Sequence, residues 1–249
     1  MSVVIRCGMR DGKPAVLKVS PDRARIAREA AALGRWDTVH SPAVLALDER
    51  IGALLIEAIE PGTPLVLSST YPPLEHLGEL LASLHGGDAA YSSYPSVGEH
   101  VAYLFDASEV MYERTPSLAA VIPPELYAHG RELALGPAAD ASPPVLLHGD
   151  LTPRNILDGG DERGLVATDP APCLGDAAFD AVDLVFWLAD DVEAITSRAA
   201  TLAPAIGADP ERLLAWCRAF AGMCALELAE SPTVNPVRVR ALAAMAALA

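Results

Sequence analysis

The sequence predicts an α+β protein with two lobes, a small antiparallel sheet followed by a larger group of helices. Two pairs of β-rich segments precede residue 60, and a break rich in proline and glycine follows them. Most of the remaining chain carries apolar residues at helical spacing. We therefore expect an N-terminal lobe at residues 1–60, a hinge near residues 57–62 and a helical C-terminal lobe at residues 61–249.

The chain of 249 residues is acidic, with a formal net charge of −15. Nucleic acid is not an expected partner, because phosphate binding requires a basic surface. The acidity instead suits a cationic small molecule, although solubility alone explains it equally well. The first residues lack a signal-peptide pattern, and no apolar run reaches the ~18 to 20 residues of a transmembrane helix. We expect a cytoplasmic protein with no membrane partner, present as a monomer or weak dimer.

Two hairpins account for the predicted sheet. The first joins residues 3–7 to residues 14–19, and Asp11-Gly12 between them favours a tight turn because the turn requires positive φ. The second joins residues 43–48 to residues 53–59, again through a short polar and glycine-containing connection. Alternation of apolar and polar residues then places one face of each strand toward the core.

A helix over residues 21–36 follows the first hairpin, and Glu29 falls within its apolar stripe. A carboxylate on a core-facing stripe requires a cation. Lys18, eleven residues earlier in the second strand, is the candidate partner. Two alternatives remain at this point: Lys18 is an ordinary solvated strand lysine, or Glu29 pairs with Arg25 or Arg28 on an exposed flank.

The predicted hinge begins at Glu57 and ends at Gly62. Backbone groups of such a hinge, here those of Glu57 and Ile59, are expected to meet the base of a bound nucleotide. A plain linker is the alternative, since Pro61 and Gly62 are typical of either.

The middle of the chain is mainly helical. Leu74, Leu77, Leu81 and Leu84 mark an amphipathic helix from about residue 73 to His85, which Gly86-Gly87 ends. We interpret His85 as a helix-end or packing residue. The pattern then predicts a loop at residues 88–98, weak helices at 99–113 and 124–135, and a flexible segment at 136–144.

One stretch contains the polar residues best suited to catalysis and metal binding. Asp150 and Asn155 lie five residues apart between two short apolar runs, and Asp169 follows a further strand. A hairpin of residues 155–158 and 165–169 would bring Asn155 and Asp169 to one edge. Amide and carboxylate oxygens suit Mg²⁺. We therefore predict a phosphoryl-transfer site in which Asp150 accepts a hydroxyl proton, while Asn155 and Asp169 hold Mg²⁺ against ATP phosphates.

Two more acids follow this stretch. Asp176 is a good N-cap for a helix that packs under the site, and Asp180 lies one turn later. Either acid is also expected to brace the catalytic loop, through the His148 ring or through backbone amides. Helices over residues 190–204, 210–229 and from about 235 complete the chain, and they carry the further acids Asp190, Asp191, Glu193, Glu227 and Glu230.

The order of these residues resembles the aminoglycoside phosphotransferase family, with features of its streptomycin 6-kinase and hydroxyurea phosphotransferase branch. The resemblance rests on Lys18, Glu29, His148-Gly149-Asp150-Leu151-x-x-x-Asn155, Asp169 and Gly175-Asp176-x-x-x-Asp180, on Ala167-Thr168-Asp169-Pro170, and on the segment from Gly207 to Trp216. It implies a protein-kinase-like bilobal fold. It also implies that Asp150 is the catalytic base, that Asn155 and Asp169 bind Mg²⁺, and that Lys18, held by Glu29, meets ATP. His148 and Asp180 are implied structural members of the catalytic loop.

One departure from this family pattern concerns the N-terminal lobe. Only seventeen residues precede Lys18, too few for the extra strand and the phosphate-covering turn that the family carries there. We therefore expect a shortened lobe or an internal start. The leading hypothesis is antibiotic resistance through ATP- and Mg²⁺-dependent phosphorylation of a cationic, streptomycin-like acceptor. The alternatives are a kinase of an endogenous metabolite and a non-catalytic, pseudokinase-like binding protein. A protein kinase is disfavoured because no activation segment follows Asp169.

Overall fold

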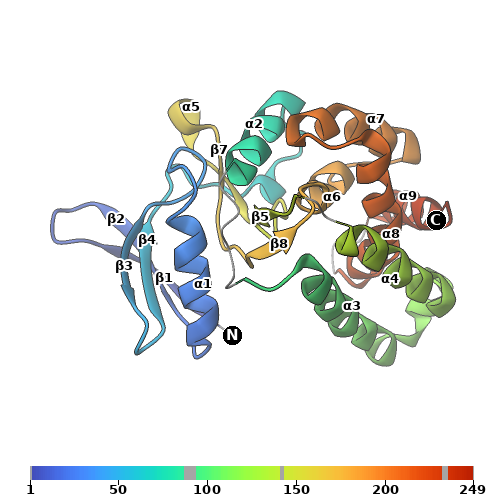
Figure 1. The fold of residues 1–249 in the computed structure, drawn as a ribbon, viewed down its shortest axis with the longest axis horizontal. Helices are drawn as coiled ribbons and strands as arrows, with labels where there is room; N and C mark the ends of the chain where they lie inside the picture. The colour runs from blue at the N-terminus through green and yellow to red at the C-terminus, as the bar shows by residue number, and fades with distance from the viewer. Residues whose placement is uncertain (1, 87–93, 141–142, 232–234, 249) are drawn as a thin grey trace.

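The computed structural model describes residues 2–86, 94–140, 143–231 and 235–248. Its N-terminal part is a four-stranded antiparallel sheet in the order β1-β2-β4-β3. The strands are β1 (Val3–Gly8), β2 (Pro14–Val19), β3 (Val44–Asp48) and β4 (Ala53–Glu57). Figure 1 shows this sheet at one end of the molecule with α1 (Arg23–Leu33) against it. Lys18 pairs in register with Leu54, which places the lysine in the middle of the sheet.

Helix α1 begins as the sequence predicts but ends earlier. The side chain of Asp22 accepts the N–H of Arg25 at 2.9 Å, which satisfies one of the unpaired donors of the first turn. Ile26 and Leu33 are buried in the core. The helix stops at Leu33 rather than at Trp36, because glycine at position 34 disfavours a further helical turn. Trp36 is still buried, so the chain after the helix stays against the protein.

The segment after β4 is anchored rather than free. Gly62 N–H donates to the carbonyl of Asp158 at 2.8 Å, and Asp158 N–H donates to the carbonyl of Thr63 at 2.9 Å. Residues 62–64 therefore extend along β6 (Ile156–Asp158) in the second half of the molecule. The strand that leads into this segment ends at Glu57, two residues before the predicted end.

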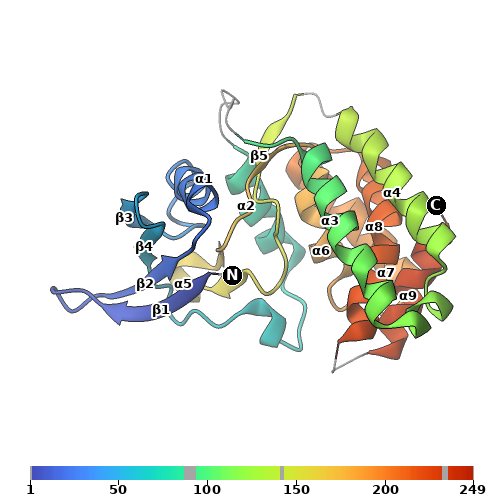
Figure 2. The ribbon, with the colours of Figure 1, turned by 90° about the horizontal axis from the view of Figure 1, so that it is seen from below.

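The remainder is mostly helical, with α8 in its centre. Helix α8 packs against α4, α6 and α9 (Figure 2). The helices are α2 (Leu74–His85), α3 (Val97–Arg114), α4 (Pro124–Ala139), α5 (Gly160–Arg163), α6 (Ala178–Phe186), α7 (Val192–Leu202), α8 (Pro210–Glu230) and α9 (Pro236–Ala246), with 3₁₀ turns η1 (Leu65–Leu67), η2 (Pro116–Ala120) and η3 (Ala203–Ile206). No helix in the described part of the chain is long and apolar enough to cross a membrane.

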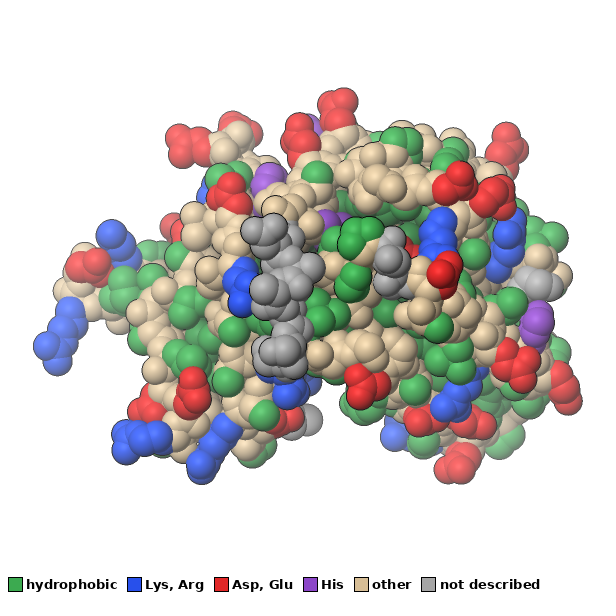
Figure 3. Space-filling model, in the orientation of Figure 1, with side chains coloured by type: hydrophobic (Ala, Val, Ile, Leu, Met, Phe, Trp, Pro, Cys, Tyr) green, Lys and Arg blue, Asp and Glu red, His purple; other side chains and the backbone are tan. Residues whose placement is uncertain are grey.

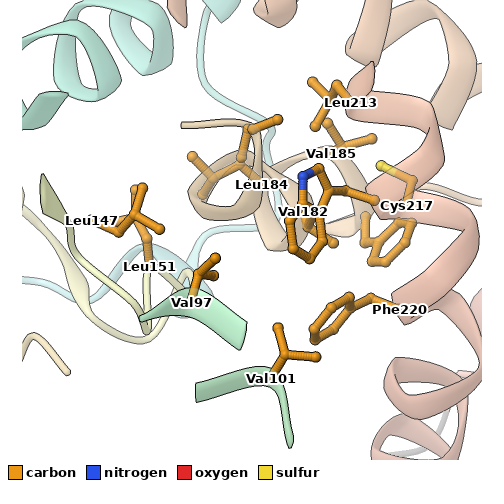
Figure 4. Close-up of a cluster of buried hydrophobic side chains, with 14 of the residues drawn as sticks. Val97, Val101, Leu147, Leu151, Val182, Leu184, Val185, Leu213, Cys217 and Phe220 are labelled. Carbon is orange, nitrogen blue, oxygen red and sulfur yellow. The ribbon is translucent and has the colours of Figure 1, made fainter. Parts of the chain in front are cut away.

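Two short β ladders lie between the sheet and the helices. Strand β5 (Val145–Leu147) pairs with β8 (Cys173–Gly175), and β6 pairs with β7 (Leu165–Ala167). Apolar side chains from β5, α3, α6 and α8 form the core beside them, including Leu147, Val182 and Phe220 (Figure 4). The two ladders support the loops that carry the predicted catalytic residues.

The fold prediction of an α+β, bilobal protein is confirmed, whereas the boundaries of α3 and α4 differ from those predicted. Helix α4 extends to Ala139 with Pro137 in its last turn, so the segment predicted as flexible from residue 136 is partly helical. Residues 141–142 of that segment, and residues 88–93 of the predicted loop, lie outside the described residues. Ser96 ends that loop as the N-cap of α3, with Glu99 completing a capping box.

Candidate active site

The loop between β5 and β6 is held by the buried carboxylate of Asp180, which extends from α6. Its oxygens accept the N–H groups of His148 at 2.7 Å and Gly149 at 2.9 Å, and His85 donates at 3.0 Å. Burial alone would raise the pKa of Asp180, but the hydrogen bond and charge of His85, with His148 and the Gly149 amide, hold it below its usual range. Asp180 therefore braces the loop, and His85 is a helix-end residue that supports it.

Gly149 is required by the same turn. Its φ is +78°, and a β-carbon at this position would lie 2.0 Å from the carbonyl oxygen of Ala171. Only glycine combines that backbone conformation with such a close approach. The turn brings the next residue, Asp150, toward the cleft.

His148 links the catalytic loop to the segment that carries Asp169. Its Nε2–H donates to the carbonyl of Thr168 at 3.0 Å, and its Nδ1 accepts the N–H of Asp150 at 3.3 Å. Burial lowers its pKa, which favours the neutral ring that these two bonds require. The ring also stacks on Trp36 with centroids 5.9 Å apart. His148 therefore positions the loop and does not face the cleft.

Asp150 and Asn155 form one unit. The Asn155 Nδ2 group donates to the Asp150 carbonyl at 2.9 Å and to its Oδ2 at 3.0 Å. Burial and the nearby Asp169 carboxylate raise the pKa of Asp150 to about 6, against smaller lowering effects of the Asn155 hydrogen bond and of Arg25. A carboxylate with a pKa near neutral is suited to accept a proton.

Lys18 lies between two carboxylates. It is 5 % exposed, its Nζ lies 2.7 Å from Oε2 of Glu29, and it also donates to Asp169 across the cleft. Glu29 is 1 % exposed, and burial raises its pKa above the usual range, against the smaller lowering effects of the charge and hydrogen bond of Lys18. The alternatives of a solvated lysine and an exposed glutamate are therefore wrong. The three residues connect β2, α1 and the segment after β7.

The residues that the sequence assigned to a metal fit Mg²⁺. Because the Nδ2 group of Asn155 is turned to Asp150, its Oδ1 is on the opposite side, and no described residue donates a hydrogen bond to it. Thr168 donates its N–H and Oγ1–H to the carbonyl of Asn155 at 2.8 and 3.1 Å, which holds the neighbouring Asp169 beside Asn155. Asp169 is held at φ +56°, a conformation uncommon outside glycine. Hard oxygen donors on adjacent strands match what Mg²⁺ binds.

The two predicted hinge residues differ in what they contact. The Glu57 carboxylate accepts Arg163 Nη1 at 2.8 Å and the Ala43 N–H at 3.2 Å, so its side chain joins the two halves of the protein. The N–H of Glu57 donates to the carbonyl of Ala43. Ile59 is 5 % exposed, and neither its N–H nor its C=O bonds to another described residue. Of the two, Ile59 has backbone groups left for a ligand.

Asp176 does not brace the catalytic loop, which corrects one expectation. Its Oδ2 accepts Arg212 Nε at 2.6 Å and Trp216 Nε1 at 2.7 Å, both from α8. Its Oδ1 accepts the N–H of Ala178 at 3.0 Å, at the start of α6. The carboxylate therefore supports the first turn of α6 and ties that helix to α8.

Two cavities meet at Asp150, and sequence reasoning did not find most of their polar residues. A small cavity of about 110 Å³ is lined by Asp150, Asp183 of α6 and Glu227 of α8. Burial, Glu227 and Asp150 raise the pKa of Asp183 to about 7. Burial also raises the pKa of Glu227, against the hydrogen bond from Ser108. Glu227 was among the predicted cleft acids, whereas Asp183 had only one indication, a carboxylate within an apolar helix.

The second cavity has a volume of about 470 Å³ and lies between α1, α3 and the catalytic loop. Arg25 and Arg28 line one side, and His100 and Tyr103 of α3 line the other. His100 Nε2–H donates to the carbonyl of Gly149 at 2.7 Å. The sequence offered no indication that α3 reaches the site.

This fold and this arrangement of a Lys–Glu pair, a catalytic-loop Asp and Asn, and a further Asp define the protein-kinase-like small-molecule kinases. The fold is similar to choline kinase LicA from Streptococcus pneumoniae, with a TM-score of 0.64, 13 % identity and coverage of 99 % of this chain and 90 % of that one. It is also similar to the GDP and kanamycin complex of APH(2")-IIia, with a TM-score of 0.56, 16 % identity and coverage of 92 % and 86 %.

The chain belongs to the aminoglycoside/hydroxyurea antibiotic resistance kinase family, whose profile matches residues 1–231. The family prediction made from the sequence is therefore confirmed. Streptomycin 3''-kinase of Klebsiella pneumoniae is 35 % identical over 109 residues, which are 37 % of this chain and 41 % of that enzyme. The aligned part is thus less than half the length of this relative.

Proposed function

We propose that this protein transfers the γ-phosphoryl group of ATP, with Mg²⁺, to a hydroxyl of a small cationic antibiotic of the streptomycin type. One observation carries the proposal. Lys18, held by Glu29, donates to Asp169 across the cleft, and Asp169 lies beside the Asp150–Asn155 unit. Family membership supports a small-molecule phosphotransferase in antibiotic resistance. The similar structure of APH(2")-IIia contains GDP and kanamycin, which supports a nucleotide donor and a cationic acceptor.

In this proposal each residue has a defined task. Lys18, oriented by Glu29, neutralises donor phosphates. Asp150 orients the acceptor hydroxyl and takes its proton as the acceptor oxygen forms a bond to the γ-phosphorus. The bond between that phosphorus and the β–γ bridging oxygen breaks, and ADP leaves with its electrons. Asn155 and Asp169 would hold Mg²⁺, which supplies positive charge to the phosphate oxygens.

The backbone of Ile59 is the proposed contact for the base of the nucleotide. Its N–H and C=O are free of bonds to other described residues and follow directly after β4. A purine presents one donor and one acceptor on an edge, which matches such a pair of backbone groups. The Glu57 side chain serves the contact with Arg163 instead.

A cationic acceptor fits the acid cavity beside Asp150. The carboxylate of Asp183 accepts no hydrogen bond from a described residue, and that of Glu227 accepts one from Ser108 at 3.3 Å. Two carboxylates in one small cavity repel each other, and an ammonium or guanidinium group between them would relieve that repulsion. A phosphate added to the hydroxyl of such an antibiotic adds bulk and negative charge, which would weaken binding of the antibiotic to its target.

The test measures Mg²⁺-dependent ADP release from ATP against streptomycin, other aminoglycosides, hydroxyurea and several amino sugars. We expect a cationic acceptor to stimulate release and Asp150→Asn to lower its kcat by about 10²- to 10⁴-fold, since a positioned general base contributes that much. Asp161→Asn, an exposed acid of α5, is the matched control and should retain wild-type turnover. Chelation of Mg²⁺ should abolish release.

Each other outcome has a meaning. Stimulation by an amino sugar alone indicates a kinase of an endogenous metabolite. ATP–Mg²⁺ binding without turnover for any acceptor indicates a non-catalytic binding protein. Equal turnover in wild type and Asp150→Asn contradicts the proposed role of Asp150.

A further inference from the structure

Helix α1 presents two arginines to the cleft in a protein with a large excess of acids. Arg25 and Arg28 lie three residues apart, so their side chains leave the same side of the helix. Both line the cavity of about 470 Å³ that reaches Asp150. Lys and Arg number 18 against 33 Asp and Glu in the chain. Two cations placed together at an active site therefore require an explanation.

These two guanidinium groups differ from the arginines that tie parts of the protein together. Arg6, Arg163 and Arg212 each form an ion pair with a carboxylate. Neither Arg25 nor Arg28 forms a side-chain hydrogen bond or an ion pair with any residue that the structure describes. Asp22 also lines the cavity, but its Oδ1 accepts the backbone N–H of Arg25 and so caps the helix. The pair is thus available for an anion from outside the protein.

Arg25 lies close to the Lys18–Glu29 pair and to Asp150. Arg25 precedes Glu29 by four residues and so lies one turn from the Lys18–Glu29 pair on the same side of α1. Burial raises the pKa of Asp150, and the charge of Arg25 opposes this with a smaller lowering effect. Burial lowers the pKa of His100, and the charge of Arg25 lowers it slightly further. Its charge therefore acts on Asp150 and on the opposite wall of the cavity.

Polar residues complete the opposite wall. His100 is held by the carbonyl of Gly149, next to Asp150, and Tyr103 follows one turn later on α3. A cavity with two unpaired arginines repels a cationic acceptor, whereas the neighbouring cavity with Asp183 and Glu227 attracts one. Asp150 lines both cavities and lies at their boundary. Figure 3 shows acidic side chains scattered over the surface in its view, in contrast to this local separation of charge.

We propose that Arg25 and Arg28 form an anion subsite that receives the phosphoryl group as it passes from the donor to the acceptor oxygen. This inference rests on the proposed phosphoryl transfer. Charge in that transition state is spread over three equatorial oxygens. Lys18 would neutralise part of it from the donor side, where Asn155 and Asp169 would hold Mg²⁺. A guanidinium group donates two parallel hydrogen bonds to phosphate and can neutralise the remaining charge from the acceptor side. Bond formation and cleavage are those of the proposed reaction, with the hydroxyl proton on Asp150.

The kinetic test compares Arg25→Ala, Arg28→Ala and the double variant with wild type, using the acceptor that wild type phosphorylates. We expect Arg25→Ala to lower kcat by about 10²-fold, as loss of one preorganised donor to a transition-state anion does. The KM for the acceptor should change less than threefold, and Arg25→Lys should recover part of kcat. Arg23→Ala, on α1 but outside the cavity, is the matched control. A kcat of Arg25→Ala within threefold of wild type overturns the inference.

A second readout does not depend on turnover. Thermal unfolding is followed with inorganic phosphate and with chloride at equal ionic strength. Phosphate should raise the Tm of wild type and of Arg23→Ala, and this rise should be lost in the double variant. A phosphate effect that survives in the double variant overturns the inference. Absence of turnover in wild type would refute the proposed function, and the phosphate measurement then decides on the anion subsite by itself.

Discussion

Asp180 and Asp183 lie three residues apart on the same side of α6, but their surroundings are opposite. Asp180 faces the catalytic loop and accepts hydrogen bonds from His148, Gly149 and His85. Asp183 lines the small cavity beside Asp150, and its carboxylate accepts no hydrogen bond from a described residue. Burial opposes ionisation of both, but the pKa of Asp180 is lowered and that of Asp183 is raised to about 7.

The difference shows that donors, and not burial, decide what a buried carboxylate does. Asp180 has its partners within the protein and therefore belongs to the scaffold of the loop. Asp183 has another carboxylate, Glu227, as its main charged neighbour and gains a partner only when a cation binds. One helix thus supplies both a structural acid and a binding acid.

The largest expected effect tests the structural half of this comparison. Asp180→Asn replaces an acceptor with an amide that cannot satisfy all three donors, and should lower the free energy of unfolding by about 2–4 kcal/mol. Urea denaturation at pH 7 measures it, with Asp161→Asn as control. Because the folded pKa of Asp180 is lowered, its contribution is present above the unfolded value of about 4 and is lost as pH falls through the folded pKa. The two curves should therefore converge in acid, and a constant difference down to pH 2 would contradict this assignment.

The next effect tests the binding half. Asp183→Asn should raise the KM for a cationic acceptor by about 10- to 100-fold, the worth of a hydrogen bond between charged groups, with little change in kcat. Stability should not fall, because the variant removes a carboxylate that lacks a partner. Steady-state kinetics with streptomycin and with neutral hydroxyurea measure the contrast. A proportionate loss with both acceptors would indicate that Asp183 shapes the site and does not bind charge.

The smallest effect concerns pH. Asp183 has a pKa of about 7 in the empty cavity, so it loses its charge as pH falls below that value. The ratio of kcat/KM for a cationic acceptor to that for a neutral one should decline by up to about tenfold per pH unit below 7. Titration of Asp150 affects both acceptors and cancels in the ratio. Asp183→Asn should make the ratio flat between pH 5 and 8, and a decline that persists in this variant would assign the effect to Glu227.

The catalytic loop was predictable because its residues are close in sequence. Asp150 and Asn155 are five residues apart, and the hairpin of β6 and β7 brings Asp169 beside them. The Lys18–Glu29 pair was predictable for a related reason, since a carboxylate on an apolar helix stripe needs a nearby cation. Strand β8 escaped prediction, because three residues are too short to show a period.

The charge arrangement around Asp150 was not predictable. Arg25, His100, Asp183 and Glu227 come from four helices, α1, α3, α6 and α8, that meet only in the folded protein. A charged residue on a helix, considered alone, most often belongs to a solvated face. Asp176 and Asp180 illustrate the same limit: both are acids at the start of one helix, and only packing sends one to α8 and the other to the catalytic loop.

The sequence by itself determined the two-lobed α+β architecture, because periodicity encodes it within short segments, and its motifs indicated the family by resemblance. It also predicted the catalytic constellation, most of whose residues are close in the chain. Tertiary structure decided which acids line the cavity beside Asp150, which acid braces the loop, and where two arginines lie relative to Asp150. The physical reason is that a side chain's charge state and role depend on the groups around it. Those groups are brought together by packing between elements that are distant in the chain.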